Sequence, residues 1–441
     1  MARCSTDYDL AILGGSLGSR LAACTAVRKG ARVALIAPNW PANDAADALL
    51  QRLQAKRLTF PTVPWSVLGD GVTNGECSLP MLTPTGLRTQ GIDVILEPAR
   101  FTSELALTLE NRDLKASRYL LTDGYGASIP ELAQDSLPCH QLTQLKTLPH
   151  HIAVTGRGAT AVEWAYALSR VATVTLILQD HSLLPAEDWD IQRLSEVQLN
   201  HGGITIVAAD RLGSGGTPIE AKQVDAELLV AVPQTYGWES LQLENVGLPP
   251  GHSTIAVNRY LQTSCPQIYV SGGSLGGESR PELTQQETAV ALENALFGRR
   301  HMMQYEHVFY SIHLLSPIGR WGLTEGQARE LHGHDVQIFQ ASCLPMVADQ
   351  VAQTNFCKII TIGDQILGVH LMGEGAPDLV ATLGNCPTMN ALGQSITARV
   401  KPGTLADAIH QAIEQWQGSR WKGGQWRRDW AENWFNFRRS M

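Results

Sequence analysis

Two glycine-rich turns carry the residue types and spacing that point most directly to chemistry in this sequence of 441 residues. Gly156, Gly158 and Ala161 fill the pattern G-x-G-x-x-G/A. In that pattern the first residue allows a tight turn, the second lets the backbone approach a pyrophosphate, and the third lets a helix pack closely on a strand. A second turn of the same character, near the N-terminus, consists of Gly14, Gly15, Ser16, Leu17 and Gly18. Both turns are therefore candidate sites for a dinucleotide.

Each turn lies between the elements that such a motif requires. Residues 8–37 read as strand, glycine turn, helix and strand, and residues 151–185 repeat the same order. An internal repeat of this kind reflects a repeated structural unit, so the sequence predicts two nucleotide-binding α/β domains in one chain. For the first unit we expect strands over 9–13 and 32–36 and a helix over 20–29.

The side chains around the two turns depart from the usual pattern. The second strand of a dinucleotide unit commonly ends in an acid that accepts hydrogen bonds from a ribose. The first unit has Ala37 and Pro38 there, and the second has Leu178-Gln179-Asp180. Ser16 and Ser19 replace two glycines of the first turn, but serine is small enough to keep it. Backbone N–H groups and the helix dipole still supply a phosphate site, so the ribose contact is the part that is missing.

The remaining sequence predicts further helices and strands in an α/β order. Helices are expected near residues 44–57 and over 283–296. From residue 305 onward, alternating apolar and polar residues favour an antiparallel sheet with flanking helices. Strands are expected at 92–96, 106–110, 119–121, 204–207, 228–232, 267–271, 336–339, 357–362 and 366–371.

Composition limits the class of protein. Hydrophobic residues make up 44% and charged residues 17% of the chain, which is usual for a folded globular protein. The formal net charge of −8 disfavours nucleic acid as a partner of the whole surface. The 8 cysteines are scattered singly, without metal-ligand spacing, so we expect reduced thiols and assign no metal ligand. We find no leader-like or membrane-spanning apolar run, and a cytoplasmic location follows by default.

Several segments in a fixed order extend the pattern over nearly the whole chain. They include DYDLAILGGSLG at 7–18, RYLLTDGYGASIP at 118–130, HIAVTGRGATAVEWA at 151–165, QIYVSGGS at 267–274 and FCKIITIGDQILGVHLMGEGAPDLV at 356–380. In these segments and their order, the chain resembles the FAD-dependent pyridine nucleotide–disulfide oxidoreductases, the group that contains dihydrolipoamide dehydrogenase, glutathione reductase and mercuric reductase.

The resemblance implies an α/β architecture with two Rossmann-like dinucleotide-binding domains and a C-terminal α+β dimerisation domain. An FAD-type domain, split into residues 1–148 and 263–304, would be interrupted by an inserted NAD(P)-type domain at 149–262. The dimerisation domain would follow at 305–415, and a Trp/Arg-rich tail at 416–441 begins where the resemblance ends.

The chain departs from this family at the positions of its dithiol chemistry. The redox-active C-x-x-x-x-C of the family should follow the second strand, yet no cysteine lies between Cys24 and Cys77. The His of the C-terminal acid–base motif is replaced by Ala412. Cys386-Pro387-Thr388 imitates part of that motif, and we interpret it as chance because its base is missing. A dithiol relay is therefore not expected.

The resemblance also suggests which residues contact cofactors. Thr122-Asp123-Gly124 stands where the family has A-T-G, and Gly272-Gly273 stands where it has G-D, whose Asp binds the ribityl chain of FAD. Asp123 would place a carboxylate near a pyrophosphate unless something pairs with it. The FAD site would thus comprise the turn Gly14–Gly18 with Thr122, Gly124, Gly272 and Gly273, and the NAD(P)H site would comprise Gly156, Gly158, Ala161 and Glu163.

Two hypotheses of function remain open from the sequence. The first is an FAD-binding oxidoreductase without dithiol chemistry, which passes electrons from NAD(P)H through the flavin to a small acceptor such as a quinone. The alternative is a cofactor-poor pseudoenzyme that acts as a dimeric scaffold or a partner-docking protein. No catalytic residue can be assigned under either hypothesis.

Partners are expected at the C-terminal part of the chain. The resemblance implies a homodimer through the C-terminal domain. In the tail, Trp426, Trp430 and Trp434 recur at i, i+4 and i+8 beside several arginines, a pattern typical of a helix that lies on a membrane surface. Packing of these indoles on a protein partner is an equal alternative. We expect no nucleic acid partner, and the location is cytoplasmic with either peripheral membrane attachment or partner docking.

Overall fold

The computed structural model describes residues 6–55, 65, 79–126, 136–179, 182–212, 220–232, 237–249, 254–277, 280–344, 354–384, 386–395, 400–422 and 438–439. The chain divides into two compact units. The first consists of Met1–Ala186 and Leu199–Gln304, and the second consists of Glu187–Gln198 and Tyr305–Met441.

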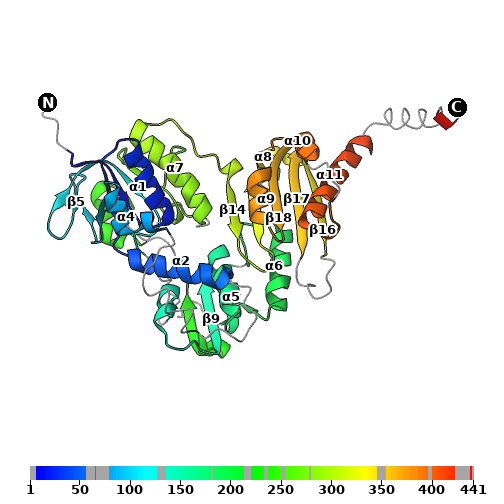
Figure 1. The fold of residues 1–441 in the computed structure, drawn as a ribbon, viewed down its shortest axis with the longest axis horizontal. Helices are drawn as coiled ribbons and strands as arrows, with labels where there is room; N and C mark the ends of the chain where they lie inside the picture. Colours follow the sequence, from blue (N-terminus) through cyan, green and yellow to red (C-terminus); the bar gives the residue numbers. More distant parts are fainter. Residues whose placement is uncertain are drawn as a thin grey trace. The chain divides into compact units, whose positions relative to one another are not determined.

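The first unit contains a parallel five-stranded sheet in the order β13-β7-β1-β2-β3. Helices α1 (Leu17–Arg28) and α7 (Pro281–Phe297) pack on one face of this sheet (Figure 1). A small antiparallel sheet, β4-β5-β6, packs on the other face. The strands are β1 (Tyr8–Leu13), β2 (Val33–Ile36), β3 (Asp93–Ile95), β4 (Arg100–Phe101), β5 (Leu107–Thr108), β6 (Asp113–Leu114), β7 (Ala116–Leu121) and β13 (Ile268–Val270).

Alternate residues of β1 supply the cores on the two faces of this sheet. Leu10 and Ile12 are buried on the face that meets α1 and α7, and Ala11 and Leu13 are buried on the opposite face. A parallel strand that is covered on both faces must be apolar throughout, and this is why a short apolar run predicted the strand. The helix predicted at 283–296 begins slightly earlier, with Pro281 in its first turn, where the missing N–H of proline is tolerated.

A second parallel sheet in the first unit has the order β11-β10-β9-β12-β8. Helix α5 (Gly158–Ser169) connects β9 to β10, and α2 (Trp40–Ala55) packs against α5. The unit also contains the short helix α4 (Pro84–Thr89). The strands are β8 (Leu137–Pro138), β9 (His151–Gly156), β10 (Thr173–Leu178), β11 (Thr205–Ala208) and β12 (Leu228–Ala231).

The second unit is built on an antiparallel sheet in the order β14-β15-β18-β17-β16. Helix α6 (Trp189–His201) starts in this unit. The strands are β14 (Phe309–Ile312), β15 (Ile318–Gly322), β16 (Val336–Cys343), β17 (Asn355–Ile362) and β18 (Gln365–Met372), and the other helices are α8 (Glu325–His332), α9 (Ala376–Leu383), α10 (Met389–Ser395) and α11 (Leu405–Lys422). The predicted α/β fold class is confirmed.

Helix α11 covers one face of the antiparallel sheet with apolar side chains. Ala412, at the position of the family's histidine, is fully buried in this core. Trp416 is buried in the same core, and its indole N–H donates to the carbonyl oxygen of Gly363 at 3.2 Å. This tryptophan, the first residue of the predicted tail, therefore packs as part of the second unit. Trp426, Trp430 and Trp434 lie outside the described residues.

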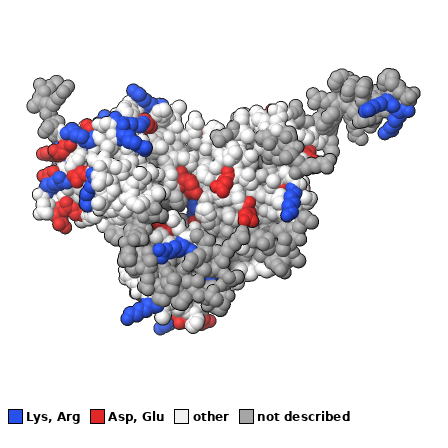
Figure 2. Space-filling view, in the orientation of Figure 1, with Lys and Arg blue, Asp and Glu red and all other residues white. Residues whose placement is uncertain are grey.

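The described residues show mixed surface charge and no membrane-spanning helix. Basic and acidic side chains are interspersed on the part of the first unit that Figure 2 draws near the N-terminus, so no single-sign field covers the described residues there. Within the described part of the chain, no helix combines the length and the apolar character needed to cross a membrane.

Candidate cofactor-binding site

The carboxyl ends of β1, β7 and β13 meet at one edge of the first parallel sheet. The chain leaves β1 through α1 to pair β2 on one side of β1, whereas β7 pairs on the other side. In open α/β sheets ligands bind at the carboxyl edge where the connections diverge in this way. This edge is therefore the place at which the fold itself predicts a binding site.

The turn after β1 is joined directly to the turn after β7. Gly14 has φ +140°, and a Cβ there would overlap the carbonyl oxygen of Thr122, so only glycine fits. The N–H of Gly15 donates to the Gly124 carbonyl at 3.1 Å, and the N–H of Ser16 donates to the Asp123 carbonyl at 3.1 Å. The two turns therefore hold each other in place.

Ser16 and Ser19, which replace two glycines of the motif, fit into the turn after β1. The hydroxyl of Ser16 caps α1 by accepting from the N–H of Ser19 at 3.3 Å, and the two hydroxyls lie 2.8 Å apart. Among the described residues, no acceptor is placed for the N–H groups of Leu17 or Gly18, at the start of the helix. Such N–H groups at a helix N-terminus suit a phosphate.

Two buried carboxylates accept hydrogen bonds from the backbone of the turn after β13. Asp123 accepts from the N–H of Gly273 at 2.8 Å and from the hydroxyl of Thr284 at 2.8 Å. Glu287 of α7 accepts from the N–H of Gly272 at 2.6 Å. Two consecutive backbone donors are thus paired with carboxylates, and this part of the edge presents acceptors rather than phosphate donors.

A cation and an aromatic ring lie beside the turn after β1. The guanidinium of Arg20 is 3.8 Å from the centroid of the Trp40 ring, and its Nε donates to the carbonyl of Gly15 at 2.8 Å. Both side chains are buried, as is Ala37 at the end of β2. The edge therefore carries a buried positive charge next to α1, while the ribose acid is missing as the sequence indicates.

The second glycine turn joins β9 to α5. A Cβ on Gly156 would lie 2.9 Å from that of Ala161, so the close approach of helix and strand requires glycine there. Gly158 has φ +58° and starts the helix. Gln179, after β10, donates its side-chain N–H to the hydroxyl of Thr155 at 3.1 Å and supplies no acid. Asp180 lies outside the described residues.

Glu163 forms a buried ion pair with Arg280. The two guanidinium Nη atoms each lie 2.8 Å from one of the carboxylate oxygens, so the pair is bidentate. Glu163 lies in α5, which connects two strands of the second sheet. Arg280 is the residue immediately before α7, which packs on the first sheet. The pair therefore ties together the two glycine-turn domains of the first unit.

Comparison with known proteins identifies the family of this chain. Residues 8–291 match the family model described as pyridine nucleotide-disulphide oxidoreductase. The chain belongs to this family. The family is FAD-dependent and takes electrons from NAD(P)H.

Individual members of the family align over nearly the whole chain. It is 26% identical to a dihydrolipoyl dehydrogenase of Bacillus subtilis, over 92% of this chain and 97% of the relative. It is 25% identical to a glutathione reductase of Nostoc, over 89% and 96%. The solved structure of the HOCl-induced flavoprotein disulfide reductase RclA from Escherichia coli superposes with a TM-score of 0.71 at 20% identity, over 92% of this chain and 99% of that one. The structural likeness supports the fold.

Most of the predicted FAD-site residues of this oxidoreductase come together at the carboxyl edge. The adjoining turns after β1, β7 and β13 contain Gly14–Gly18, Gly124, Gly272 and Gly273. Thr122 differs, because its hydroxyl lies in the interior, 3.5 Å from that of Thr288. The sequence patterns do not indicate Arg20, Trp40, Arg280, Thr284 or Glu287 as site residues. Asp123 is visible in the sequence only as a departure from the family's A-T-G, and an acidic residue within a glycine turn is the signal that could have found it.

The residues present fit FAD at this edge. The N–H groups of Leu17 and Gly18 and the charge of Arg20 suit its pyrophosphate, and the carboxylate of Asp123 suits its hydroxyl groups. The free cysteines among the described residues include Cys24, which lies in α1 and is buried. Burial raises the pKa of the Cys24 thiol, which keeps it protonated and unreactive.

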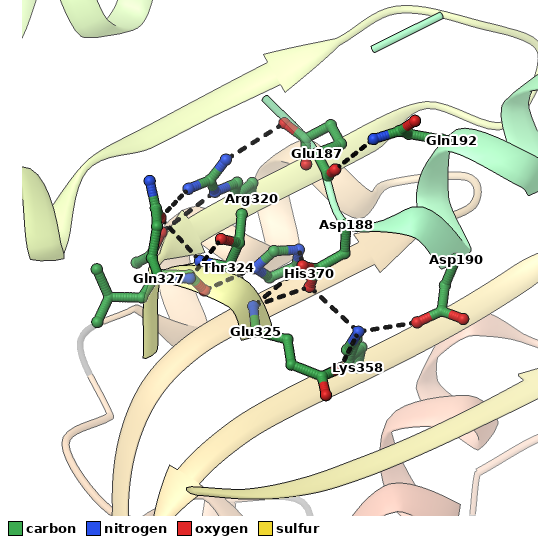
Figure 3. Close-up of polar contacts among 12 residues, drawn as sticks. Glu187, Asp188, Asp190, Gln192, Arg320, Thr324, Glu325, Gln327, Lys358 and His370 are labelled. Carbon is green, nitrogen blue, oxygen red and sulfur yellow. Dashed lines mark hydrogen bonds and ion pairs between the residues drawn. The ribbon is translucent and has the colours of Figure 1, made fainter. Parts of the chain in front are cut away.

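A cluster of charged side chains lies inside the second unit and holds parts of this unit together. Figure 3 shows Lys358 of β17 between Asp188, Asp190 and Glu325, at 3.2, 2.8 and 2.8 Å. Burial opposes the charge of Lys358, but hydrogen bonds to Asp190 and Glu325 hold its pKa above the ordinary value. Burial lowers the pKa of neighbouring His370, which stays neutral. The cluster fixes residues 187–190 on the sheet, and no potential metal-binding group of three or more His, Cys, Asp or Glu is found among the described residues.

Proposed function

We propose that this protein is an FAD-dependent oxidoreductase that takes electrons from NAD(P)H and delivers them directly to a small acceptor such as a quinone, without a dithiol. Bound FAD would supply the two-electron chemistry. The observation that carries the proposal is the glycine turn after β1, which keeps its backbone geometry and its two N–H donors at Leu17 and Gly18 although the neighbouring side chains have changed.

The positions of the cysteines support electron transfer without a dithiol. No cysteine occurs between Cys24 and Cys77, the part of the chain that holds the family's redox pair. At the other end of the chain, the position of the family's acid–base His is Ala412, which is buried in an apolar core. With neither thiolate nor base, electrons have no protein relay to pass through.

The glycine turn after β9 is the proposed NAD(P)H site. Gly156, Gly158 and Ala161 retain the spacing and the close helix–strand packing that bring the backbone up to a pyrophosphate. The ion pair of Glu163 with Arg280 holds the NAD(P)-type domain on the FAD-type domain within the same unit. It gives Glu163 a positioning role rather than a contact with the substrate.

A matched pair of variants tests the FAD site. Leu17 and Leu21 are 38% and 39% exposed and lie one turn apart on α1. Leu17→Glu places a carboxylate at the helix N-terminus, where it stabilises the helix but repels a phosphate. Leu21→Glu adds the same charge one turn away. We expect Leu17→Glu to lose bound flavin, measured by absorbance after denaturation, while Leu21→Glu retains it. Equal flavin in both variants would reject this site.

A second candidate function is a cofactor-poor dimeric scaffold. The observation that favours it is the pairing of the Gly272 and Gly273 N–H groups with Glu287 and Asp123, because two carboxylates oppose an anionic cofactor nearby. Dimerisation through residues 305–415 is part of both proposals, and light scattering of the full chain tests it. Protein that remains without flavin after incubation with excess FAD, yet dimerises, would favour the scaffold.

A further inference from the structure

We propose that Asp123 is a binding residue for hydroxyl groups in the flavin half of FAD, and that its carboxylate replaces the one that the family carries at the position of Gly273. The proposal rests on the proposed function, because it concerns the same site. It adds an identified recognition residue to a site that otherwise consists mostly of backbone groups.

The carboxylate of Asp123 is held in one position. Its Oδ1 accepts from the N–H of Gly273 at 2.8 Å, and its Oδ2 accepts from the hydroxyl of Thr284 at 2.8 Å. The side chain is buried, with 7% of its surface exposed. A carboxylate fixed by two donors from two different elements, the turn after β13 and α7, is preorganised for contacts with a ligand.

The chemistry of a carboxylate selects hydroxyl groups over phosphate. An ionised carboxylate only accepts hydrogen bonds, at about four positions, so a hydroxyl can donate to it, whereas a phosphate is an anion and an acceptor. The phosphate donors lie at Leu17 and Gly18, on the next turn. The adenosine ribose usually binds at the end of the second strand, which is β2 here. Asp123 follows β7, which pairs with β1 on the side opposite to β2. Its hydroxyl ligands therefore belong to the flavin half.

The absence of a side chain at Gly272 leaves the space that the Asp123 carboxylate occupies. A Cβ on Gly272 would lie 2.5 Å from the Asp123 carboxylate, and Gly272 also has φ +82°. Gly273 is not among the residues with a positive φ, so its backbone conformation is one that an L residue can adopt. The backbone nitrogen of Gly273 lies 2.8 Å from Oδ1 of Asp123, so an acid at residue 273 would add a second negative charge close to this carboxylate.

The first experiment separates hydroxyl recognition from phosphate repulsion. We compare Asp123→Asn with the exposed control Asp113→Asn, and measure FAD affinity of the apoprotein by flavin fluorescence and ADP affinity by competition. Loss of a charged hydrogen bond predicts FAD binding weaker by about 10- to 100-fold in Asp123→Asn, with ADP binding unchanged. Tighter FAD binding in Asp123→Asn would overturn the proposal, because it would mean that the carboxylate repels the cofactor.

The second experiment moves the carboxylate. Asp123→Gly alone is expected to lose FAD affinity, and Asp123→Gly combined with Gly273→Asp is expected to recover most of it. Recovery also shows that the single variant failed by losing a ligand rather than by misfolding. If Asp123→Gly binds FAD as the wild type does, or if the double variant fails to recover, the inference is wrong while FAD binding stands. If the wild type itself takes up no FAD, the proposed function fails first.

Discussion

Arg280 and Glu163 form a bidentate ion pair within the first unit, with both Nη atoms 2.8 Å from carboxylate oxygens and side-chain exposures of 3% and 5%. Charges buried to this degree are costly unless they are paired, so each residue depends on the other. The pair joins α5, which follows the second glycine turn, to the start of α7, which packs on the first sheet.

Breaking this pair should destabilise the first unit. Arg280→Met leaves the carboxylate of Glu163 buried without its main partner, and we expect a loss of about 3–5 kcal/mol in the free energy of unfolding by urea. The double variant Arg280→Met with Glu163→Leu should lose clearly less. As a control, Arg32→Met removes an exposed pair with Asp9 and should cost about 0–1 kcal/mol. A double variant as unstable as the single one would contradict this role of the pair.

Acid should weaken the second unit through Glu325. Burial alone would raise the pKa of Glu325, but hydrogen bonds to Lys358 and Arg329 hold it below the ordinary value of 4.5. A lowered pKa means that the unfolded chain takes up the proton first. The stability from this group is therefore full above that ordinary value and is lost as the pH falls through the lower folded value. Urea unfolding at a series of pH values measures this loss.

Lys358 is the partner whose removal should change that pH profile. In Lys358→Met the pKa of Glu325 should rise toward its ordinary value, and the acid-dependent loss should become smaller. The same variant should be less stable near neutral pH by about 3–5 kcal/mol, because Asp188, Asp190 and Glu325 lose their shared cation. An unchanged pH profile would mean that the cluster does not control the titration of Glu325.

Disulfide substrates should not be reduced. Without a cysteine between Cys24 and Cys77, glutathione disulfide, lipoamide and thioredoxin-like proteins find no thiolate to receive them. Oxidation of NADH and NADPH, followed by absorbance with each substrate and with glutathione reductase as a positive control, should stay at the level without substrate. Robust turnover with any of the three would contradict the proposal of direct transfer from the flavin.

The tail should attach the protein to a surface. Three tryptophans at helical spacing beside arginines predict salt-sensitive binding to anionic vesicles. Deletion of residues 423–441 keeps α11 and the buried Trp416, and should abolish co-sedimentation. The full chain with Trp426, Trp430 and Trp434 replaced by Ala is the matched variant and should also stay in solution. Equal solubility of all three forms would reject membrane attachment and leave docking to a protein.

The fold could be predicted where apolar runs and glycine turns coincide. Residues 9–13 lie in a strand buried on both faces, and Gly14 is required by backbone geometry, so both leave a clear pattern. Strand β15 was not predicted, because Ile318–Gly322 is short, contains Arg320 and two glycines, and shows no alternation of apolar and polar residues. The buried Arg320 forms an ion pair with Glu187 and hydrogen bonds with Tyr310 and Gln327, and Glu187 is distant in the sequence.

The site was less predictable than the fold for the same reason. The glycines of the site are recognisable locally, but Asp123 forms hydrogen bonds with Gly273 and Thr284, which lie 150 and 161 residues later in the chain. Nothing in the sequence around Arg280 indicates that it pairs with Glu163. Long-range pairing of charges depends on the assembled sheets, and single-sequence patterns carry no signal for it.

The visible spectrum of the purified full chain, after incubation with FAD and removal of the excess, tests the central claim most directly when NADH or NADPH is added without oxygen. The proposal predicts flavin absorbance that is bleached by at least one of the two nucleotides and restored by a quinone. A spectrum without flavin bands, or bands that neither nucleotide bleaches, would contradict it.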